Sequence, residues 1–381
     1  MHKSPPDPRP GYGVGIIGYG FMGKAHTYAH KTLPLYYKDL PYTTRMVGVC
    51  TRHENTAAQA AREQGFGWYT TDPQEIVTHP DIQMVHICTP NAQHAPWAIA
   101  ALEAGKAVYC EKPLAANTQE AQAIADAVQR TGGRLQVVFH NRCFPATLRA
   151  RELVEGGFLG EVTAFRVAYL HAGNIDPHRS GWRFDANQGG GGALYDLGSH
   201  LIDLFLWLCP EVPARLAAHT TILHKQRQGQ PVLADDHAVM VMELANGASG
   251  TLEATKLATG IQDELRLEIH GTKGALRMNL MDANWLDIYN ATVPEGPYGG
   301  ERGWQRIECV GRYLPPAMFP AVKATPGWLR GHVHSLYTFM EALHNGTPMQ
   351  PDARDGLRVQ RLMDLAYESA EKGIWVAMEG E

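Results

Sequence analysis

Three residues of this 381-residue chain, Lys112, Asp196 and His200, have the side chains that oxidation of an alcohol requires. A neutral imidazole can accept a hydroxyl proton near pH 7, and a lysine ammonium can stabilise the developing alkoxide. Asp196, His200 and Asp203 would share one face of a helix. Each could instead be an ordinary surface residue. An Asp and a His four apart could also hold a metal, but two ligands make a poor site, so we predict no metal.

Lys112 follows a short apolar run, in the segment Cys110-Glu111-Lys112-Pro113. The preceding apolar run also ends in polar and turn residues, which could cap the next helix or bind a ligand. In open parallel sheets, ligands bind at the carboxyl ends of the strands. We therefore expect cofactor contacts from Thr89, Pro90, Asn91, His94, Glu111 and Lys112.

The segment Gly18-Tyr19-Gly20-Phe21-Met22-Gly23 is a G-x-G-x-x-G that follows an apolar run and opens a helical one. Its glycines permit a tight turn and close approach of the backbone to a pyrophosphate at the helix N-terminus. A glycine-rich turn without a ligand is the alternative, but the strand-turn-helix context favours a dinucleotide. The expected contacts are Gly18, Gly20, Phe21, Met22 and Gly23.

The next predicted strand ends in Cys50-Thr51-Arg52-His53, without an acid to accept bonds from both ribose hydroxyls of NAD. Arg52 could pair with the 2′-phosphate of NADP. A solvated Arg52 beside a ribose-binding Thr51 would serve NAD equally well. The sequence therefore predicts NAD or NADP, with NADP slightly favoured.

Short apolar runs alternate with helical segments in the first part of the chain, which predicts a doubly wound α/β domain with a parallel sheet. Asn117 and Glu120 have the spacing of a capping box. We assign residues 1–140 to this dinucleotide-binding (Rossmann) domain. The predicted strands are residues 13–17, 46–50, 84–88, 107–110 and 135–139, and the predicted helices are residues 55–64, 92–104 and 117–129.

Beyond residue 160, longer β-type runs are separated by hairpin-like turns, which predicts an open, mainly antiparallel sheet. Residues 141–381 are assigned to an α+β domain for substrate binding and oligomerisation. Four glycines, Gly189 to Gly192, precede Asp196 and either form a flexible link or permit close packing against cofactor and sugar. The predicted strands are residues 162–171, 238–244, 249–254, 266–270 and 275–279, and the predicted helices are residues 332–344 and 355–371.

Composition excludes several classes of protein. The net charge is −5, without blocks of like charge, so we expect binding to neither nucleic acid nor membranes. The polar, proline-rich N-terminus does not resemble a signal peptide, and no apolar run reaches about 20 residues, so we expect a soluble, cytoplasmic protein. Six cysteines without a C-x-x-C pair are expected to be reduced and mostly buried.

The segments GYGFMG, CTPNAQH, CEKPL and GGGALYDLGSH, in this order, resemble the glucose–fructose oxidoreductase/inositol dehydrogenase (Gfo/Idh/MocA) family. GYGFMGKAH and LEATKLATG further resemble its levoglucosan dehydrogenase-like branch. The resemblance implies a Rossmann domain followed by an open sheet that forms homodimers or homotetramers. It also places the family's substrate and catalytic positions at Lys112, Asp196 and His200. Thr51 departs from the aspartate that often ends the family's second strand.

The expected function is hydride transfer between a nicotinamide cofactor and a secondary alcohol of a sugar, an anhydrosugar or a cyclic polyol. A redox-neutral glycoside-cleaving or epimerising enzyme with tightly held NAD is one alternative, and a non-catalytic NAD(P) and sugar sensor is another. Lys112 or His200 could be the proton acceptor. Additional predicted contacts are Arg142, Trp182 and Arg183 to the cofactor, and His140, Tyr169, His171, Arg183, Asp196 and His200 to the substrate.

Overall fold

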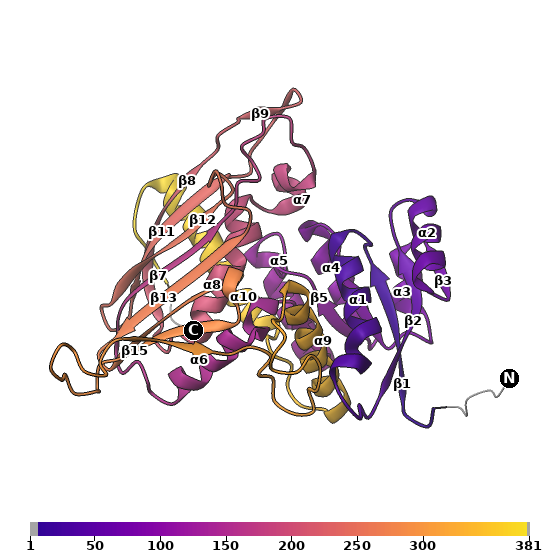
Figure 1. The fold of residues 1–381 in the computed structure, drawn as a ribbon. Coiled ribbons are helices and arrows are strands. Elements are labelled where there is room, and N and C mark those ends of the chain that lie inside the picture. Colours follow the sequence, from indigo (N-terminus) through magenta and orange to yellow (C-terminus); the bar gives the residue numbers. More distant parts are fainter. Residues whose placement is uncertain (1–6, 379–381) are drawn as a thin grey trace.

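The computed structural model describes residues 7–378. Residues 1–6, part of the polar N-terminal segment considered above, lie outside the described residues. Two sheets form the framework, one in each half of the chain (Figure 1). Among the helices of the described part, none has both the length and the hydropathy needed to cross a bilayer. All six cysteines are free and all but Cys88 are buried, as predicted.

The first sheet is parallel and has six strands in the order β3-β2-β1-β4-β5-β6. Its order reverses between β1 and β4, so the carboxyl ends of these strands flank the crevice where such folds bind ligands. The predicted parallel sheet is confirmed. The short strand β3 was missed because it has three residues, too few for a periodic pattern. The strands are β1 (Gly11–Ile17), β2 (Thr43–Cys50), β3 (Trp68–Thr70), β4 (Met84–Ile87), β5 (Ala107–Cys110) and β6 (Leu135–Val137).

Helices connect these strands, and the cap of α5 forms only partly as predicted. The Asn117 side chain accepts a bond from the backbone N–H of Glu120 at 2.8 Å. The Glu120 carboxylate accepts from the backbone of Ala116 at 3.2 Å, one residue before the position that a capping box requires. The helices are α1 (Phe21–Tyr36), α2 (Glu54–Gln64), α3 (Pro73–Thr78), α4 (His94–Glu103) and α5 (Thr118–Thr131).

The second sheet has nine strands in the order β16-β15-β14-β13-β7-β12-β11-β8-β17. Neighbouring strands run antiparallel except β7 and β12, which confirms a mainly antiparallel sheet. Strands β8 and β15 to β17 were not predicted. The strands are β7 (Val162–Leu170), β8 (Pro213–Thr221), β11 (His237–Leu244), β12 (Ser249–Thr255), β13 (Glu264–Gly271), β14 (Gly274–Asn279), β15 (Trp285–Asn290), β16 (Trp304–Glu308) and β17 (Val376–Ala377); β9 (Gln226–Arg227) and β10 (Gln230–Pro231) form a separate hairpin.

Three helices pack on the face of the second sheet that is turned toward the first domain, namely α6 (Pro145–Glu155), α8 (Ser199–Leu208) and α10 (Ala353–Lys372) (Figure 1). Helix α10 also packs against α5 of the first domain, and one apolar core runs through both halves. The shared core holds the residues of the second half at a fixed distance from the strand ends of the first.

Helix α9 (Trp328–Asn345) comes late in the sequence but packs against α1. Its Leu336, Phe339 and Met340 belong to the same apolar cluster as Val14 and Ile16 of β1. Helix α9 is therefore part of the core of the first domain, although it lies within residues 141–381. This return of the chain places the first turns of α9 beside the strand ends that carry the predicted site.

Candidate active site

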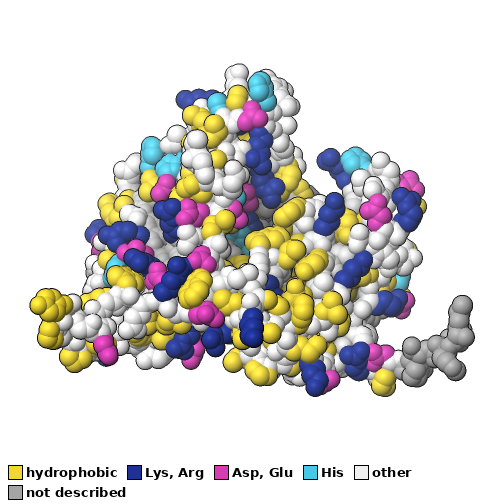
Figure 2. Space-filling model, in the orientation of Figure 1, with side chains coloured by type: hydrophobic (Ala, Val, Ile, Leu, Met, Phe, Trp, Pro, Cys, Tyr) yellow, Lys and Arg dark blue, Asp and Glu magenta, His cyan; other side chains and the backbone are white. Residues whose placement is uncertain are grey.

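A cavity of about 1320 Å³ lies at the carboxyl ends of β1, β2, β4 and β5, between the two halves of the molecule. Figure 2 shows a hollow there, with charged and histidine side chains around it. The structure brings most predicted site residues to this cavity. They are Gly18, Gly20, Phe21, Met22, Thr51, Arg52, Thr89, Pro90, Asn91, Glu111, Lys112, His140, Tyr169, His171, Trp182, Arg183, Asp196 and His200.

The side chains of Lys112 and Asp196 meet although the residues are 84 positions apart in the chain. Lys112 Nζ donates to the Asp196 backbone carbonyl at 2.8 Å and to Asp196 Oδ1 at 3.1 Å. Lys112 is the second residue after β5, so the sheet anchors its backbone. The ammonium is thereby held at the cavity by two acceptors on the other domain.

Two more cations bind Asp196 Oδ2: Lys256 Nζ at 2.8 Å and Arg183 Nε at 3.2 Å. Burial by itself raises the pKa of Asp196, but the charges of Lys256, Lys112 and Arg183 together lower it by more, so its pKa lies well below the usual range. Asp196 is therefore a carboxylate at neutral pH. It neutralises part of a strongly positive site.

Asp196 lies in a π-helical turn, Leu194–Gly198, that leads directly into α8. Such wide turns are rare and frequent at functional sites. The Asp235 carboxylate anchors the start of the turn by accepting from the backbone N–H groups of Gly192 and Leu194 at 2.8 and 2.9 Å. The π-helical turn is thus held in place by the side chain of Asp235, which lies just before β11 of the second sheet.

The glycines before this turn permit close packing against the chain's own backbone. A Cβ on Gly192 would lie 1.8 Å from the Asp235 carbonyl oxygen, and one on Gly190 would lie 2.4 Å from that of Ala116. No side chain fits at either position. This close packing of one backbone segment on another contradicts the predicted flexible link, whereas packing of the glycines against cofactor and sugar stays a prediction.

His200 lies one turn beyond Asp196 and is almost fully buried, with 6% of its surface exposed. Its ring lies edge-on to that of His140, with centroids 5.2 Å apart, and near that of Tyr169, at 5.9 Å. Burial and then the charge of Lys112 lower the pKa of His200 well below its ordinary value. His200 is accordingly a neutral imidazole that can accept a hydrogen bond from a ligand.

The glycine-rich turn fits a dinucleotide. Gly18 has φ +91°, and a Cβ there would lie 2.5 Å from the Cys88 carbonyl oxygen. A Cβ on Gly20 would have no atom within 4 Å, so the backbone before α1 faces open space that a phosphate can enter. Thr89 lines the same cavity, and its buried hydroxyl lacks a partner among the described residues. The conformation of the two glycines, the open N-terminus of α1 and the unpartnered hydroxyl of Thr89 therefore all fit a bound dinucleotide.

Three predicted contacts and the proposed helix stripe need correction. Arg142 binds Asp203, with Nε 2.9 Å from Oδ2, and both line a separate small pocket. Asp203 therefore does not line the cavity together with Asp196 and His200, because its carboxylate binds Arg142 in that separate pocket. His94 is fully buried with both ring nitrogens near backbone carbonyls, so it braces the loops instead of facing the cavity. Gly23 packs against Gly18 and also does not line it.

Sequence reasoning missed Lys256, Asp263 and Trp328. Lys256 directly follows β12 and is buried against Asp196. Asp263 binds His171 at 2.9 Å on the cavity wall, and Trp328 opens α9 at the same wall. A lysine at a strand end was a usable signal for Lys256. Asp263 and Trp328 lie in irregular or late segments, where no local pattern indicates which cavity they reach.

Comparison with known protein families agrees with this geometry. Residues 12–139 match the oxidoreductase family's NAD-binding Rossmann fold, and residues 151–378 match the family's C-terminal alpha/beta domain, both of the Gfo/Idh/MocA group. The chain belongs to the Gfo/Idh/MocA oxidoreductase family. It is an oxidoreductase with an NAD-binding domain, as the sequence predicted.

Individual relatives are similar over nearly the whole chain. Levoglucosan dehydrogenase of Pseudarthrobacter phenanthrenivorans is 34% identical, over 95% of this chain and 97% of its own length. A solved structure of levoglucosan dehydrogenase in complex with NADH and levoglucosan superposes with a TM-score of 0.91 at 34% identity, covering 96% of this chain and 99% of that one. Inositol 2-dehydrogenase of Rhizobium meliloti is 26% identical, over 94% of this chain and 97% of its own.

Proposed function

We propose that this protein is an NAD-dependent dehydrogenase of a secondary hydroxyl on a sugar, an anhydrosugar of the levoglucosan type or a cyclic polyol. One observation carries the proposal: the cavity that contains the dinucleotide turn also contains Lys112, Asp196 and His200. Cofactor and acid-base groups must meet within about 3–3.5 Å of the reacting carbon for hydride transfer. The relatives described above act on levoglucosan and inositol, which supports this substrate class.

The bound NAD would supply the hydride acceptor. We propose that Gly18, Gly20 and the N-terminus of α1 hold its pyrophosphate, and that Thr51 and Thr89 donate or accept hydrogen bonds along it. Each of these residues lines the cavity. The cavity that they line reaches from the end of β2 to the end of β5, where Lys112 lies.

We assign the proton chemistry to His200 and Lys112. Neutral His200 accepts the hydroxyl proton, and the negative charge of Asp196 stabilises the imidazolium that results. Lys112 donates a hydrogen bond to the same substrate oxygen and stabilises the developing alkoxide. Asp196 binds a substrate hydroxyl and holds Lys112 in place. Lys112 itself is the alternative proton acceptor.

The remaining wall suits a polyhydroxylated ring. Arg183 lies over the Trp182 ring with its guanidinium carbon 4.4 Å from the centroid, and His171 is paired with Asp263. Such a wall offers donors, acceptors and an aromatic face, which together recognise sugars. We propose that these four residues and Tyr169 select the substrate.

We further propose that the enzyme accepts NADP as well as NAD. The residues that follow β2, Thr51 to His53, carry no carboxylate to repel a 2′-phosphate, and Arg52 among them lines the cavity. A guanidinium can bind phosphate with two hydrogen bonds. The relatives' NADH complexes support NAD as the ordinary cofactor.

A homodimer or homotetramer and a cytoplasmic location remain our expectations. Helices cover one face of the second sheet, and the other face is available to a second copy (Figure 1). Light scattering after size-exclusion chromatography measures the assembly directly. A mass of one chain, 42.0 kDa, would contradict it.

The test is a screen of sugars, anhydrosugars and inositols with NAD and NADP, followed at the absorbance of the reduced cofactor. We expect one compound class to be oxidised, and Lys112→Met and His200→Asn to lower kcat/KM by about 10²–10⁴. Calorimetric titration that detects neither cofactor would overturn the proposal. Product formation without net reduction of NAD would instead favour the redox-neutral alternative.

A further inference from the structure

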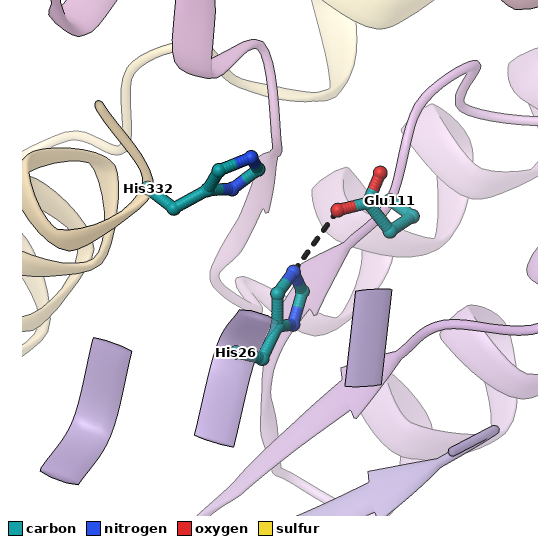
Figure 3. Close-up of side chains that lie close together, drawn as sticks. All are labelled: His26, Glu111 and His332. Carbon is teal, nitrogen blue, oxygen red and sulfur yellow. Dashed lines mark hydrogen bonds and ion pairs between the residues drawn. The ribbon is translucent and has the colours of Figure 1, made fainter. Parts of the chain in front are cut away.

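Three buried side chains meet behind the cavity: His26 of α1, Glu111 directly after β5, and His332 of α9 (Figure 3). One ligand atom from each lies within 4.8 Å of the other two. His26 Nε2 is 3.0 Å from Glu111 Oε1. Exposed surface is 1% for His26, 5% for Glu111 and 1% for His332. The three come from distant segments, so sequence spacing did not indicate the cluster.

His332 is the member that requires explanation. Both of its ring nitrogens are buried, and neither has a hydrogen-bond partner among the described residues. Buried polar atoms are ordinarily paired, and an unpaired one in a core suggests an unseen ligand. The ring stacks on His140 with centroids 3.9 Å apart and contacts Trp328, so its direction toward His26 and Glu111 is fixed by packing.

The chemistry of the three side chains suits a metal ion. Imidazole nitrogens and carboxylate oxygens are both common zinc ligands. Glu111 supplies a negative charge that offsets part of the charge of a divalent ion.

A chain of further hydrogen bonds extends behind His26. His26 Nδ1 lies 3.0 Å from His86 Nδ1, His86 Nε2 lies 3.1 Å from His30 Nε2, and His30 Nδ1 lies 3.2 Å from Thr44 Oγ1. If His26 coordinates through Nε2, its proton is on Nδ1, and each ring can donate to the next until Thr44 accepts. Metal-bound histidines normally donate their other N–H in this way, which orients the ring.

We propose that His26, Glu111 and His332 form a binding site for one divalent first-row transition ion, with Zn²⁺ preferred. Two imidazoles and one carboxylate are a known zinc ligand set, with a water molecule completing the tetrahedron. Glu111 also lines the cavity, which gives ion and water a route in. The ion would join α1, the end of β5 and α9, and so fasten the late helix to the first domain.

The experiment uses untagged full-length protein, treated with a chelator, dialysed against Zn²⁺ and then freed of unbound ion. We expect one zinc per chain by plasma mass spectrometry, and replacement by Co²⁺ should give the visible absorption of a tetrahedral site. His332→Ala should retain less than a tenth of the metal. His334→Ala is the matched control, because His334 is a partly buried histidine two residues away in α9 that pairs with Tyr37 instead.

Folding is followed separately by circular dichroism, and Glu111→Gln provides a second variant of nearly identical shape. Loss of metal from folded Glu111→Gln or His332→Ala, with retention by His334→Ala, supports the site. Absence of bound zinc and of Co²⁺ absorption in the wild-type protein, or equal retention by His332→Ala, overturns it and leaves a water molecule as the occupant. These readouts are independent of dehydrogenase activity.

Discussion

Replacing Asp196 by asparagine tests whether this carboxylate is the counter-ion that lets three cations gather at the cavity. The amide keeps the shape of the side chain but removes the charge beside Lys112 and Lys256, whose side chains are 13% and 8% exposed. Removing one partner of a buried ion pair costs about 3–5 kcal/mol. Asp196 is itself 23% exposed to the cavity, where water screens charges, so we expect about 3 kcal/mol.

This loss corresponds to a measurable shift in Tm. An unfolding entropy of about 2.1 cal/mol/K per residue gives about 0.8 kcal/mol/K for the 381-residue chain. A destabilisation of about 3 kcal/mol therefore lowers Tm by about 4 °C in scanning calorimetry. Asp203→Asn is a matched control in α8, the helix that directly follows the turn of Asp196, because its partner Arg142 lies outside the cavity. It should lower Tm while kcat/KM stays unchanged, whereas Asp196→Asn should lower both.

A second substitution, Lys256→Met, sharpens the test, because its effect on stability should have opposite signs in the wild-type and Asp196→Asn proteins. In the wild-type protein, Lys256→Met removes one of the cations that bind Asp196, so it should reduce stability. In the Asp196→Asn background, the same change removes a buried ammonium that has lost its counter-charge, so it should restore stability. Urea unfolding of the four proteins measures both effects. If Lys256→Met destabilises both backgrounds equally, Asp196 is not the counter-ion and the electrostatic reasoning is wrong.

Three other predictions follow from single residues. Burial depresses the pKa of His200, so the folded protein excludes a proton that the unfolded chain binds below about pH 6.5. The free energy of unfolding should therefore fall as the pH is lowered from 7 to 5. In His200→Asn this fall should be less steep, by up to about 1.4 kcal/mol per pH unit. An equal slope in urea unfolding would contradict this. Gly192→Ala should cost at least about 2 kcal/mol, because its Cβ would overlap the backbone of Asp235, and unchanged Tm would refute the close approach. Arg52→Ala should raise KM for NADP at least tenfold and KM for NAD less than threefold, and equal effects would remove Arg52 from phosphate recognition.

Much of the fold was predictable because its signals are local. Each buried parallel strand shows as a short apolar run, and the turn after β1 needs glycine at Gly18 for steric reasons. The strand ends then placed Thr89 and Lys112 at one edge of the sheet. Short strands such as β3 and edge strands such as β16, mostly exposed, lack an apolar pattern and were missed.

Side-chain partners were less predictable. Arg142 looked available for a ligand, but its guanidinium is buried against Asp203 of α8. Lys256 looked like one lysine among many, and its position beside Asp196 depends on how β12 packs against the π-helical turn. The choice of partner depends on distances between elements, which periodicity does not contain.

The sequence by itself determined the class of fold, the dinucleotide turn and the identities of Lys112, Asp196 and His200, because strand, helix and turn propensities act over a few residues. Only the tertiary structure decided that Lys112 reaches Asp196 across 84 positions, and that α9 returns to the first domain to bring His332 against His26. Those contacts come from burial of apolar faces between distant elements, which fixes relative positions that no local pattern records.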